Sequence, residues 1–174
     1  MMKKLKLKVW LVVLCLILVP ALSGCYSFAQ GELPEHIKTI SVPVFGDETR
    51  SGIGQLRERL TTEMIDKIQG QSSLVILQST RDANSVLEGV IKSYSDLPSQ
   101  VSSQTERATQ NRISITVTVT YRDLVEKKTL FTQSFTGFSD YAVGDFSGQQ
   151  DAITNAITNV TDDVLNKLLA GSGW

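Results

Sequence analysis

The sequence predicts an α+β fold: a two-layer sandwich in which two helices pack on one face of a mostly antiparallel sheet of four to five strands. Apolar residues recur every three or four positions in segments 53–69 and 148–170, which is the period of an amphipathic helix. Apolar and polar residues alternate elsewhere, most cleanly over 112–121, as in a strand with one buried face. The order strand, helix, four strands, helix favours helices gathered on one face of the sheet.

Strands are expected in five segments where apolar residues alternate or run together. These segments are 39–45, 74–77, 85–94, 112–121 and 129–138. Pro43 cannot donate a hydrogen bond to a ladder, which favours an edge or a strand end for the first segment. Residues 126–128 are expected to form the turn of a hairpin. The Ser- and Thr-rich segment 95–110 is expected to be a polar loop.

The two expected helices carry start and stop signals. Ser51 is the expected N-cap of the first helix, and Gly70 stands where a left-handed C-cap residue belongs. Ser147, with Gln150 three residues later, fits a capping box at the start of the second helix.

The first 24 residues are predicted to be a lipoprotein signal peptide. They contain four lysines and no acidic residue, and an uncharged apolar stretch occupies positions 9–22. Its 14 residues suit the apolar core of a signal peptide and fall short of the roughly 20 residues that cross a bilayer as a helix. Ser23 and Gly24 precede Cys25, and this arrangement resembles a bacterial lipobox.

A lipobox implies that Cys25 is acylated and becomes the first residue of the mature chain. Two or more acyl chains hold a protein essentially permanently on a membrane. Tyr26 follows the cysteine, where the inner-membrane retention signal of enterobacteria has an aspartate, so we expect the periplasmic side of the outer membrane. The predicted organisation is a signal peptide over 1–24, a lipidated tether over 25–36 and one α+β domain over 37–174.

The composition of the mature chain argues against nucleic-acid binding and against catalysis. Without the first 24 residues, 13 basic and 18 acidic residues remain, and no basic footprint of the kind that binds nucleic acid is apparent. His36 is the one histidine, and we expect it to be solvated in a loop, not to act as a base or metal ligand. No Gly-x-Ser-x-Gly elbow is present. We therefore expect a protein that is not an enzyme and has no metal and no cofactor.

One face of the expected strand 112–121 is neutral but polar. Its outward positions after Arg112 carry hydroxyl groups, at Ser114, Thr116, Thr118 and Thr120. Hydroxyl groups lose water at a lower cost than charged groups do, so such a face could be enclosed by another polar, wet surface. The alternative is that threonine is simply a favourable residue on an exposed strand.

Several segments, in this order and spacing, resemble the LptE-like family of lipopolysaccharide-assembly lipoproteins. They are Cys-Tyr-Ser-Phe at 25–28, Leu-Pro-Glu-His-Ile-Lys-Thr-Ile at 33–40, Leu-x-Gly-x-Ile at 87–91, and Ile-Thr-Val-Thr-Val at 115–119 with Arg-Asp-Leu at 122–124. The resemblance covers about 150 residues, which is the whole predicted mature chain.

This resemblance implies a plug inside the β-barrel translocon LptD, where the protein would assist barrel assembly and help deliver lipopolysaccharide to the outer leaflet. The polar lumen of such a barrel would suit the hydroxyl face. Family members are thought to contact the phosphates of lipid A through basic residues near one end of the sheet. Here the resemblance implies Arg107 and Arg112 first, because arginine pairs well with phosphate, and then Lys92, Lys127 and Lys128.

Two other classes of protein remain open. A lipoprotein of the LpoB or curli-secretion type, acting as a regulator or a secretion component, has a similar first strand, which residues 42–49 nearly match. A lipid-anchored hydrolase is the other class. The protein that co-purifies with the chain would separate a barrel plug from a synthase activator.

Overall fold

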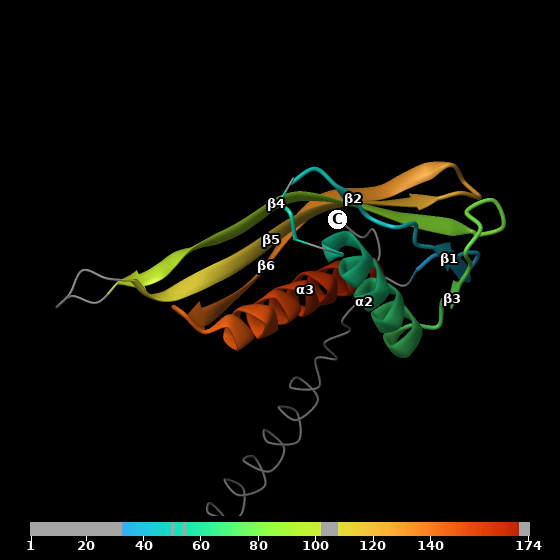
Figure 1. Cartoon of the computed structure of the whole chain (residues 1–174). Helices are drawn as coiled ribbons and strands as arrows, with labels where there is room; N and C mark the ends of the chain where they lie inside the picture. The colour runs from blue at the N-terminus through green and yellow to red at the C-terminus, as the bar shows by residue number, and fades with distance from the viewer. Residues whose placement is uncertain (1–32, 50, 54, 102–107, 171–174) are drawn as a thin grey trace, which may run out of the picture.

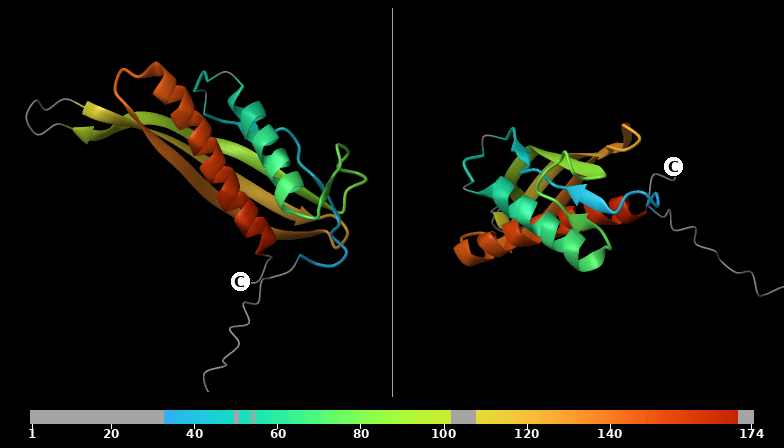
Figure 2. Two further views of the ribbon diagram at one scale, coloured as in Figure 1. Left: turned by 90° about the horizontal axis from the view of Figure 1, so that it is seen from below. Right: turned by 90° about the vertical axis from the view of Figure 1, so that its right-hand side faces the viewer.

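Two helices lie on one face of a six-stranded sheet, and no described element covers the other face (Figure 1). The computed structural model describes residues 33–49, 51–53, 55–101 and 108–170. The helices are α2 (Leu56–Gln71) and α3 (Phe146–Leu169), and Figure 2 shows both on the same side of the strands. The predicted two-layer α+β fold is therefore confirmed.

Three long antiparallel strands form most of the sheet. They are β4 (Ser85–Val101), β5 (Ala108–Asp123) and β6 (Lys128–Ala142). Three short strands pair in parallel with their neighbours: β1 (Thr39–Ser41), β2 (Gly46–Asp47) and β3 (Val75–Ile76). The order is β3-β1-β4-β5-β6, with β2 beside β4. The long strand β6 is therefore one edge of the sheet, and the other edge consists of β3, β2 and the part of β4 beyond Ile91.

The prediction that residues 95–110 form a polar loop is wrong. β4 and β5 continue as a paired ribbon as far as the pair Val101 and Ala108, and this ribbon projects beyond the helices (Figure 1). Serine and threonine are compatible with an exposed strand. Pro98 is accommodated at a shift in register between Pro98 and Gln100, which is where a proline disturbs a ladder least. Residues 102–107 lie outside the described residues.

Several expected element ends are also wrong. The first expected strand, 39–45, forms only over Thr39–Ser41 (β1) and ends before Pro43, which lacks an N–H group, while β2 begins after the expected strand, at Gly46. Helix α2 begins at Leu56 after Gln55, which adopts a left-handed conformation (φ 62°) and provides no side-chain cap, so Ser51 is not the N-cap. Gly70 lies inside α2. Helix α3 begins earlier than expected, because Asp145 caps it by accepting a hydrogen bond from the N–H of Gly148 at 2.9 Å.

The core lies between the sheet and the two helices. The inward side chains of β5 are almost completely buried, and they are Ile113, Ile115, Val117, Val119 and Tyr121. Full burial of each aliphatic side chain stabilises the fold by roughly 1.5–3 kcal/mol. The apolar stripes of both helices pack against these residues, as the periodicity of the sequence predicts.

Helix α3 passes very close to β6 at Gly137. A Cβ atom at this position would lie 2.1 Å from the carbonyl oxygen of Ala156 and 2.7 Å from the backbone nitrogen of Val160. Only glycine allows this approach of two backbones. The helix is therefore held directly against the edge strand.

A buried lysine joins the two helices. Lys67 of α2 donates to the carbonyl oxygen of Thr158 on α3 at 3.1 Å and forms an ion pair with Asp162. The carboxylate of Asp162 is therefore paired with a largely buried cation. Among the described residues, no helix has both the length and the apolar character needed to span a membrane.

Candidate functional site

The uncovered face of the sheet carries a ladder of paired hydroxyl groups across β5 and β6. Each pair joins two residues that stand directly opposite each other. The oxygen–oxygen distances are 2.9 Å for Thr116–Thr136, 2.9 Å for Thr118–Ser134 and 3.2 Å for Thr120–Thr132. Ser114 continues the row on β5 and stands opposite Phe138. Three of the four predicted face residues thus have hydroxyl partners on β6, which the sequence analysis did not identify.

The hydroxyl ladder is neutral over its whole length. Between Arg112 and Arg122, β5 contains no charged residue, and the same holds for β6 between Lys128 and Asp140. Because each hydroxyl group already has a partner, enclosing this face leaves few polar atoms without a hydrogen bond. Covering it with a polar surface therefore costs less than covering a charged face.

Arg112 stands at the end of the ladder nearest the projecting ribbon. Its Nε and Nη2 atoms donate to the two carboxylate oxygens of Asp140 at 2.8 and 2.9 Å, and its guanidinium carbon lies 4.4 Å from the centre of the Phe138 ring. Hydrogen bonds from Arg112 hold the pKa of Asp140 below its usual value. The guanidinium is therefore already paired in the free protein.

A shallow groove of about 240 Å³ lies beside Arg112. It is lined by residues of β4 and β5, which are Ser95, Leu97, Pro98, Ser99, Arg112 and Ser114. Leu97 is 62% exposed and Phe138 is 50% exposed, so apolar surface adjoins the guanidinium. The groove thus offers a cation beside exposed apolar side chains.

The other predicted basic residues are not brought together with Arg112. Lys92 donates to the carboxylate of Glu48 at 2.8 Å. Lys127 and Lys128 lie exposed at the connection between β5 and β6, which is the opposite end of β5 from Arg112. Arg107 lies outside the described residues. The four of these residues that the structure describes therefore do not form a single cluster.

His36 is not a solvated loop residue, contrary to the expectation from sequence. Its Nε2 atom lies 2.6 Å from Oδ2 of Asp123, whose side chain is fully buried. The other oxygen of Asp123 accepts the N–H groups of Val125 and Glu126 at 2.8 and 3.0 Å. The contact between His36 and Asp123, which we call the His36–Asp123 clasp, attaches the start of the described chain to the end of β5. No local sequence signal reveals it, because 87 positions separate the two residues.

Hydrogen bonds, including the one in the His36–Asp123 clasp, keep the buried carboxylate of Asp123 ionised. Burial raises the pKa of Asp123, but hydrogen bonds from Glu126, His36 and Val125 outweigh burial and leave the pKa below its usual value. Ligand atoms of His36, Asp123 and Glu126 lie within 4.8 Å of one another, as they would around a metal ion. The hydrogen bonds to Asp123 already explain why these atoms lie together. We therefore interpret the group as a structural cap at the end of β5.

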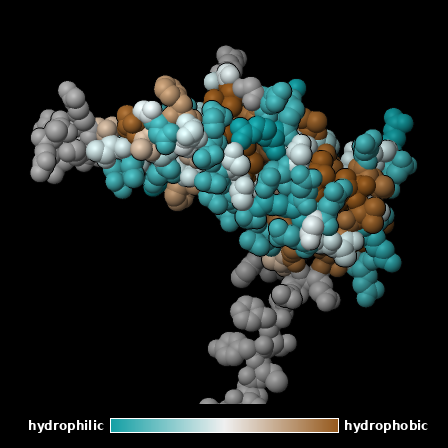
Figure 3. Space-filling view, turned by 60° about the horizontal axis from the view of Figure 1, so that its bottom comes forward, coloured by the Kyte–Doolittle hydropathy of each residue, from teal (hydrophilic) through white to brown (hydrophobic). Residues whose placement is uncertain are grey.

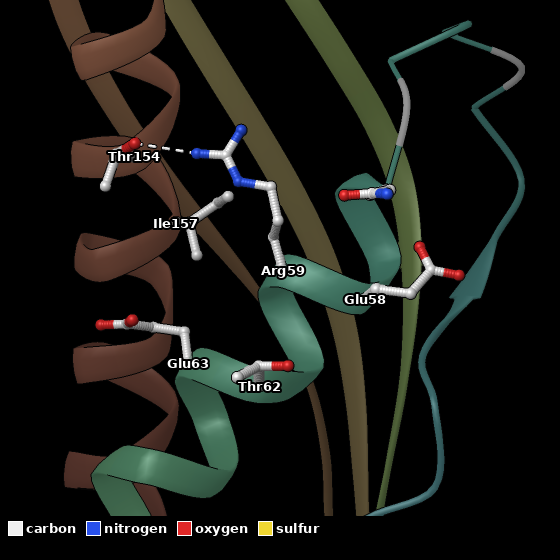
Figure 4. A pocket seen from close by; sticks show the side chains of 7 residues that line it. Glu58, Arg59, Thr62, Glu63, Thr154 and Ile157 are labelled. Carbon is white, nitrogen blue, oxygen red and sulfur yellow. Dashed lines mark hydrogen bonds between the residues drawn. The ribbon is translucent and has the colours of Figure 1, made fainter.

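A second hollow lies between α2 and α3 (Figure 4), on the largely hydrophilic outer surface of the helices (Figure 3). Its volume is about 350 Å³. Arg59 of α2 reaches across it and donates to the hydroxyl oxygen of Thr154 on α3 at 2.8 Å. Figure 4 shows Glu58 pointing away from α3. The Arg59–Thr154 bond joins the helices across the hollow, and we interpret it as a structural bridge.

The fold is that of a class of small bacterial α+β proteins that includes lipoproteins. The hypothetical protein CT253 from Chlamydia trachomatis superimposes with a TM-score of 0.60 at 8% identity, covering 78% of this chain and 97% of its own. An uncharacterized lipoprotein B from Nitrosomonas europaea gives a TM-score of 0.58 at 10% identity, with coverages of 80% and 85%. The rare lipoprotein B from Shewanella oneidensis gives 0.51 at 12% identity, with coverages of 75% and 92%.

Within this class, the chain belongs to the LptE family, described as lipopolysaccharide-assembly, whose family model matches residues 37–168. The resemblance inferred from the sequence is thereby confirmed. This is a family of assembly lipoproteins and not of enzymes. No match was found among curated proteins.

The His36–Asp123 clasp predicts a defined dependence of stability on pH. The pKa of Asp123 is lowered by folding, so its stabilisation is present above the usual carboxyl pKa and is lost as the pH falls through the folded-state pKa. We expect Asp123→Asn to lower the free energy of unfolding at neutral pH by roughly 2 kcal/mol, and the deficit to shrink below about pH 4. Urea unfolding followed by circular dichroism at several pH values measures both.

The exposed carboxylate of Asp66 provides the control. Asp66→Asn should change the free energy of unfolding by less than about 0.5 kcal/mol. An Asp123→Asn variant as stable as this control at neutral pH would contradict the role of the clasp.

Proposed function

We propose that this chain is an outer-membrane lipoprotein that plugs the LptD β-barrel translocon, assists its assembly and helps deliver lipopolysaccharide to the outer leaflet. The observation that carries the proposal is the neutral hydroxyl ladder, on a domain that belongs to the lipopolysaccharide-assembly family over residues 37–168. The lumen of an outer-membrane barrel is polar and wet. A surface with paired hydroxyl groups and no charge is suited to lie against such a wall.

In this proposal the protein acts by occupying space and by presenting surfaces, without catalysing a reaction. The hydroxyl ladder would face the polar wall, where each hydroxyl can exchange its partner for a group of the wall at little cost. The charged pairs at the two ends of the ladder, Arg112–Asp140 and Arg122–Glu88, would limit how far the domain slides along the wall, because a displaced charge would lose its solvation.

The proposed anchor is acylated Cys25, which lies outside the described residues. Eight residues from Cys25 to Leu33 span at most about 30 Å. The His36–Asp123 clasp attaches the end of this tether to the connection between β5 and β6. We therefore infer that this end of the sheet lies nearest the membrane and that the projecting ribbon points away from it.

The proposed contact with lipid A is centred on Arg112. This residue combines a guanidinium group with the exposed apolar side chains of Leu97 and Phe138, a chemistry that suits a phosphate attached to acyl chains. An incoming phosphate would compete with Asp140 for the guanidinium. Contributions from Arg107, Lys92, Lys127 and Lys128 remain predictions.

A role as a synthase activator or secretion component is the alternative function, and only the similarity of residues 42–49 favours it. In the structure this segment is not one strand, because the chain between β1 and β2 is irregular. Capture of the bound partner separates the two roles.

The plug function predicts that the barrel co-purifies with the tagged full-length chain after crosslinking in intact cells. We expect Thr118→Asp to reduce the captured barrel at least tenfold, because a carboxylate on the ladder would lose water on contact with the wall. Thr118→Asn introduces a side chain with nearly the same shape as aspartate but without the charge, and this variant should retain most of the captured barrel. Quantitative mass spectrometry of the captured proteins makes the measurement. Capture of a peptidoglycan synthase in place of a barrel would favour the alternative function.

The anchor predicts that Cys25→Ala moves the protein from the membrane fraction to the soluble periplasm. Cys15→Ala, within the proposed signal peptide, should leave the protein in the membrane fraction and serves as the matched control. Immunoblots of separated fractions measure the distribution. Membrane retention of the Cys25→Ala variant would count against lipidation.

The lipid contact predicts opposite effects for the two partners in the Arg112–Asp140 pair. Arg112→Ala should weaken binding of purified lipopolysaccharide severalfold, whereas Asp140→Asn should strengthen it, because the guanidinium is then free to pair with phosphate. Binding to immobilised lipopolysaccharide at low and high salt provides the readout. Equal affinity of both variants and the unmodified protein would place the contact elsewhere.

A further inference from the structure

The two edges of the sheet differ in how well they are protected against pairing with another strand. The edge opposite β6 consists of the two-residue strands β3 and β2 and, beyond them, of β4 from Lys92 onward. Very short edge strands avoid unwanted pairing, as do charged residues and proline, which this part of β4 has at Lys92, Asp96 and Pro98. The β6 edge is 15 residues long. Between 129 and 139 it contains no charged residue and no proline, although these residue types commonly protect an exposed edge. This unprotected edge requires an explanation.

The hydrogen bonds at the end of β6 show which backbone groups face outward. Val143 donates its N–H to the carbonyl oxygen of Thr109 at 3.2 Å, which makes the facing pair Gln110 and Ala142 a non-hydrogen-bonded pair. Such pairs alternate with hydrogen-bonded pairs along an antiparallel ladder. By this alternation, the N–H and C=O groups of Thr132, Ser134 and Thr136 point out of the sheet edge.

A side chain of α3 confirms this orientation. Asn159 donates from Nδ2 to the carbonyl oxygen of Phe138 at 3.0 Å, so this carbonyl also points out of the edge. Within the part of the chain that the structure describes, no other side chain hydrogen-bonds to an outward backbone group of β6 between 132 and 138. Asn159 bounds the open edge at one end, and the register shift near Tyr121 bounds it at the other. The open stretch is 132–136.

We propose that the edge at 132–136 pairs with an extended, uncharged segment of the barrel protein, which adds a strand to the sheet. This inference rests on the proposed function for the identity of the partner. The three outward residues present N–H and C=O groups to the partner strand and hydroxyl groups to the open face. The added strand would therefore widen the neutral hydroxyl ladder. Pairing of this kind derives its affinity from main-chain hydrogen bonds.

The position of α3 argues against a second copy of this chain as the occupant. The helix lies directly against β6 at Gly137. Pairing two β6 strands would place them about 4.8 Å apart and bring the second α3 beside the first, whereas packed helices need about 8–10 Å between their axes. The edge has room for a strand, but not for a strand that carries its own helix.

Amide hydrogen exchange on the full-length lipoprotein, alone and in its purified complex with the barrel, tests the pairing directly. Fragmentation that resolves single amides should show the N–H groups of Thr132, Ser134 and Thr136 exchanging at least tenfold more slowly in the complex. Those of Gln133 and Phe135, which face β5, should be protected in both samples. Unchanged exchange at the three outward amides would overturn the proposal.

A matched pair of variants gives a second readout. Ser134→Pro removes an outward N–H group that has no partner in β5, and Ser134→Ala removes only the hydroxyl group. We expect the proline variant to capture at least tenfold less barrel and the alanine variant to retain capture, while circular dichroism shows that both are folded. If the proline variant unfolds, amide exchange decides.

The outcomes separate the two proposals. If the unmodified protein captures no barrel, the proposed function and the strand pairing both fail. If it captures the barrel while the outward amides remain unprotected, or while a folded Ser134→Pro variant captures equally well, only the strand pairing fails.

Discussion

The alternation of side chains along β5 determines both surfaces of the domain. Every inward residue from Ile113 to Tyr121 is apolar and buried, and every outward residue between Arg112 and Arg122 carries a hydroxyl group. Because the side-chain period of a strand is two, a shift of one residue in register would exchange these faces completely. The packing of both helices and the neutrality of the open face therefore depend on one register, and Gly137 helps to fix it by admitting α3 at a single point.

The charged side chains around the hydroxyl ladder are paired with side chains of opposite charge. Arg112 with Asp140, Arg122 with Glu88 and Lys92 with Glu48 are ion pairs. Exposed pairs of this kind contribute little to stability, but they leave little unbalanced charge around the hydroxyl ladder. A phosphate would have to displace the carboxylate of Asp140 before it could bind Arg112. The domain is thus better suited to lying against polar surfaces than to attracting anions over a distance.

The fold could be predicted because two patterns dominate the sequence: apolar residues that recur every three or four positions, as in helices, and apolar residues that alternate with polar ones, as in strands. The strand at 112–121 and the helices near 53–69 and 148–170 were located correctly, with errors at their ends. The errors have local causes. Hydroxyl-rich residues of 95–110 suggested a loop, although the same residues serve equally well in an exposed strand. The N-cap of α3 is Asp145 and not Ser147 as predicted, because Ser147 and Gln150 have the residue types and the spacing of a capping box.

The candidate site could be predicted only where it lies on one element. Ser114, Thr116, Thr118 and Thr120 share a strand, so their common face follows from spacing alone. Their partners Thr132, Ser134 and Thr136 depend on the register of a hairpin, and the contact between His36 and Asp123 depends on the tertiary fold. The proposed cluster of basic residues came from resemblance alone, and the structure distributes its described members between separate parts of the sheet.

The clasp has a mechanical consequence. Tension on a tethered N-terminus enters the domain at Leu33 and reaches the His36–Asp123 contact before it reaches β1. Since β1 runs parallel to both β3 and β4, pulling along it loads the hydrogen bonds on both sides in shear, so that several must break together. If the chain is tethered at Cys25 as proposed, a load on its N-terminus would act on these hydrogen bonds together, although the first strand is only three residues long.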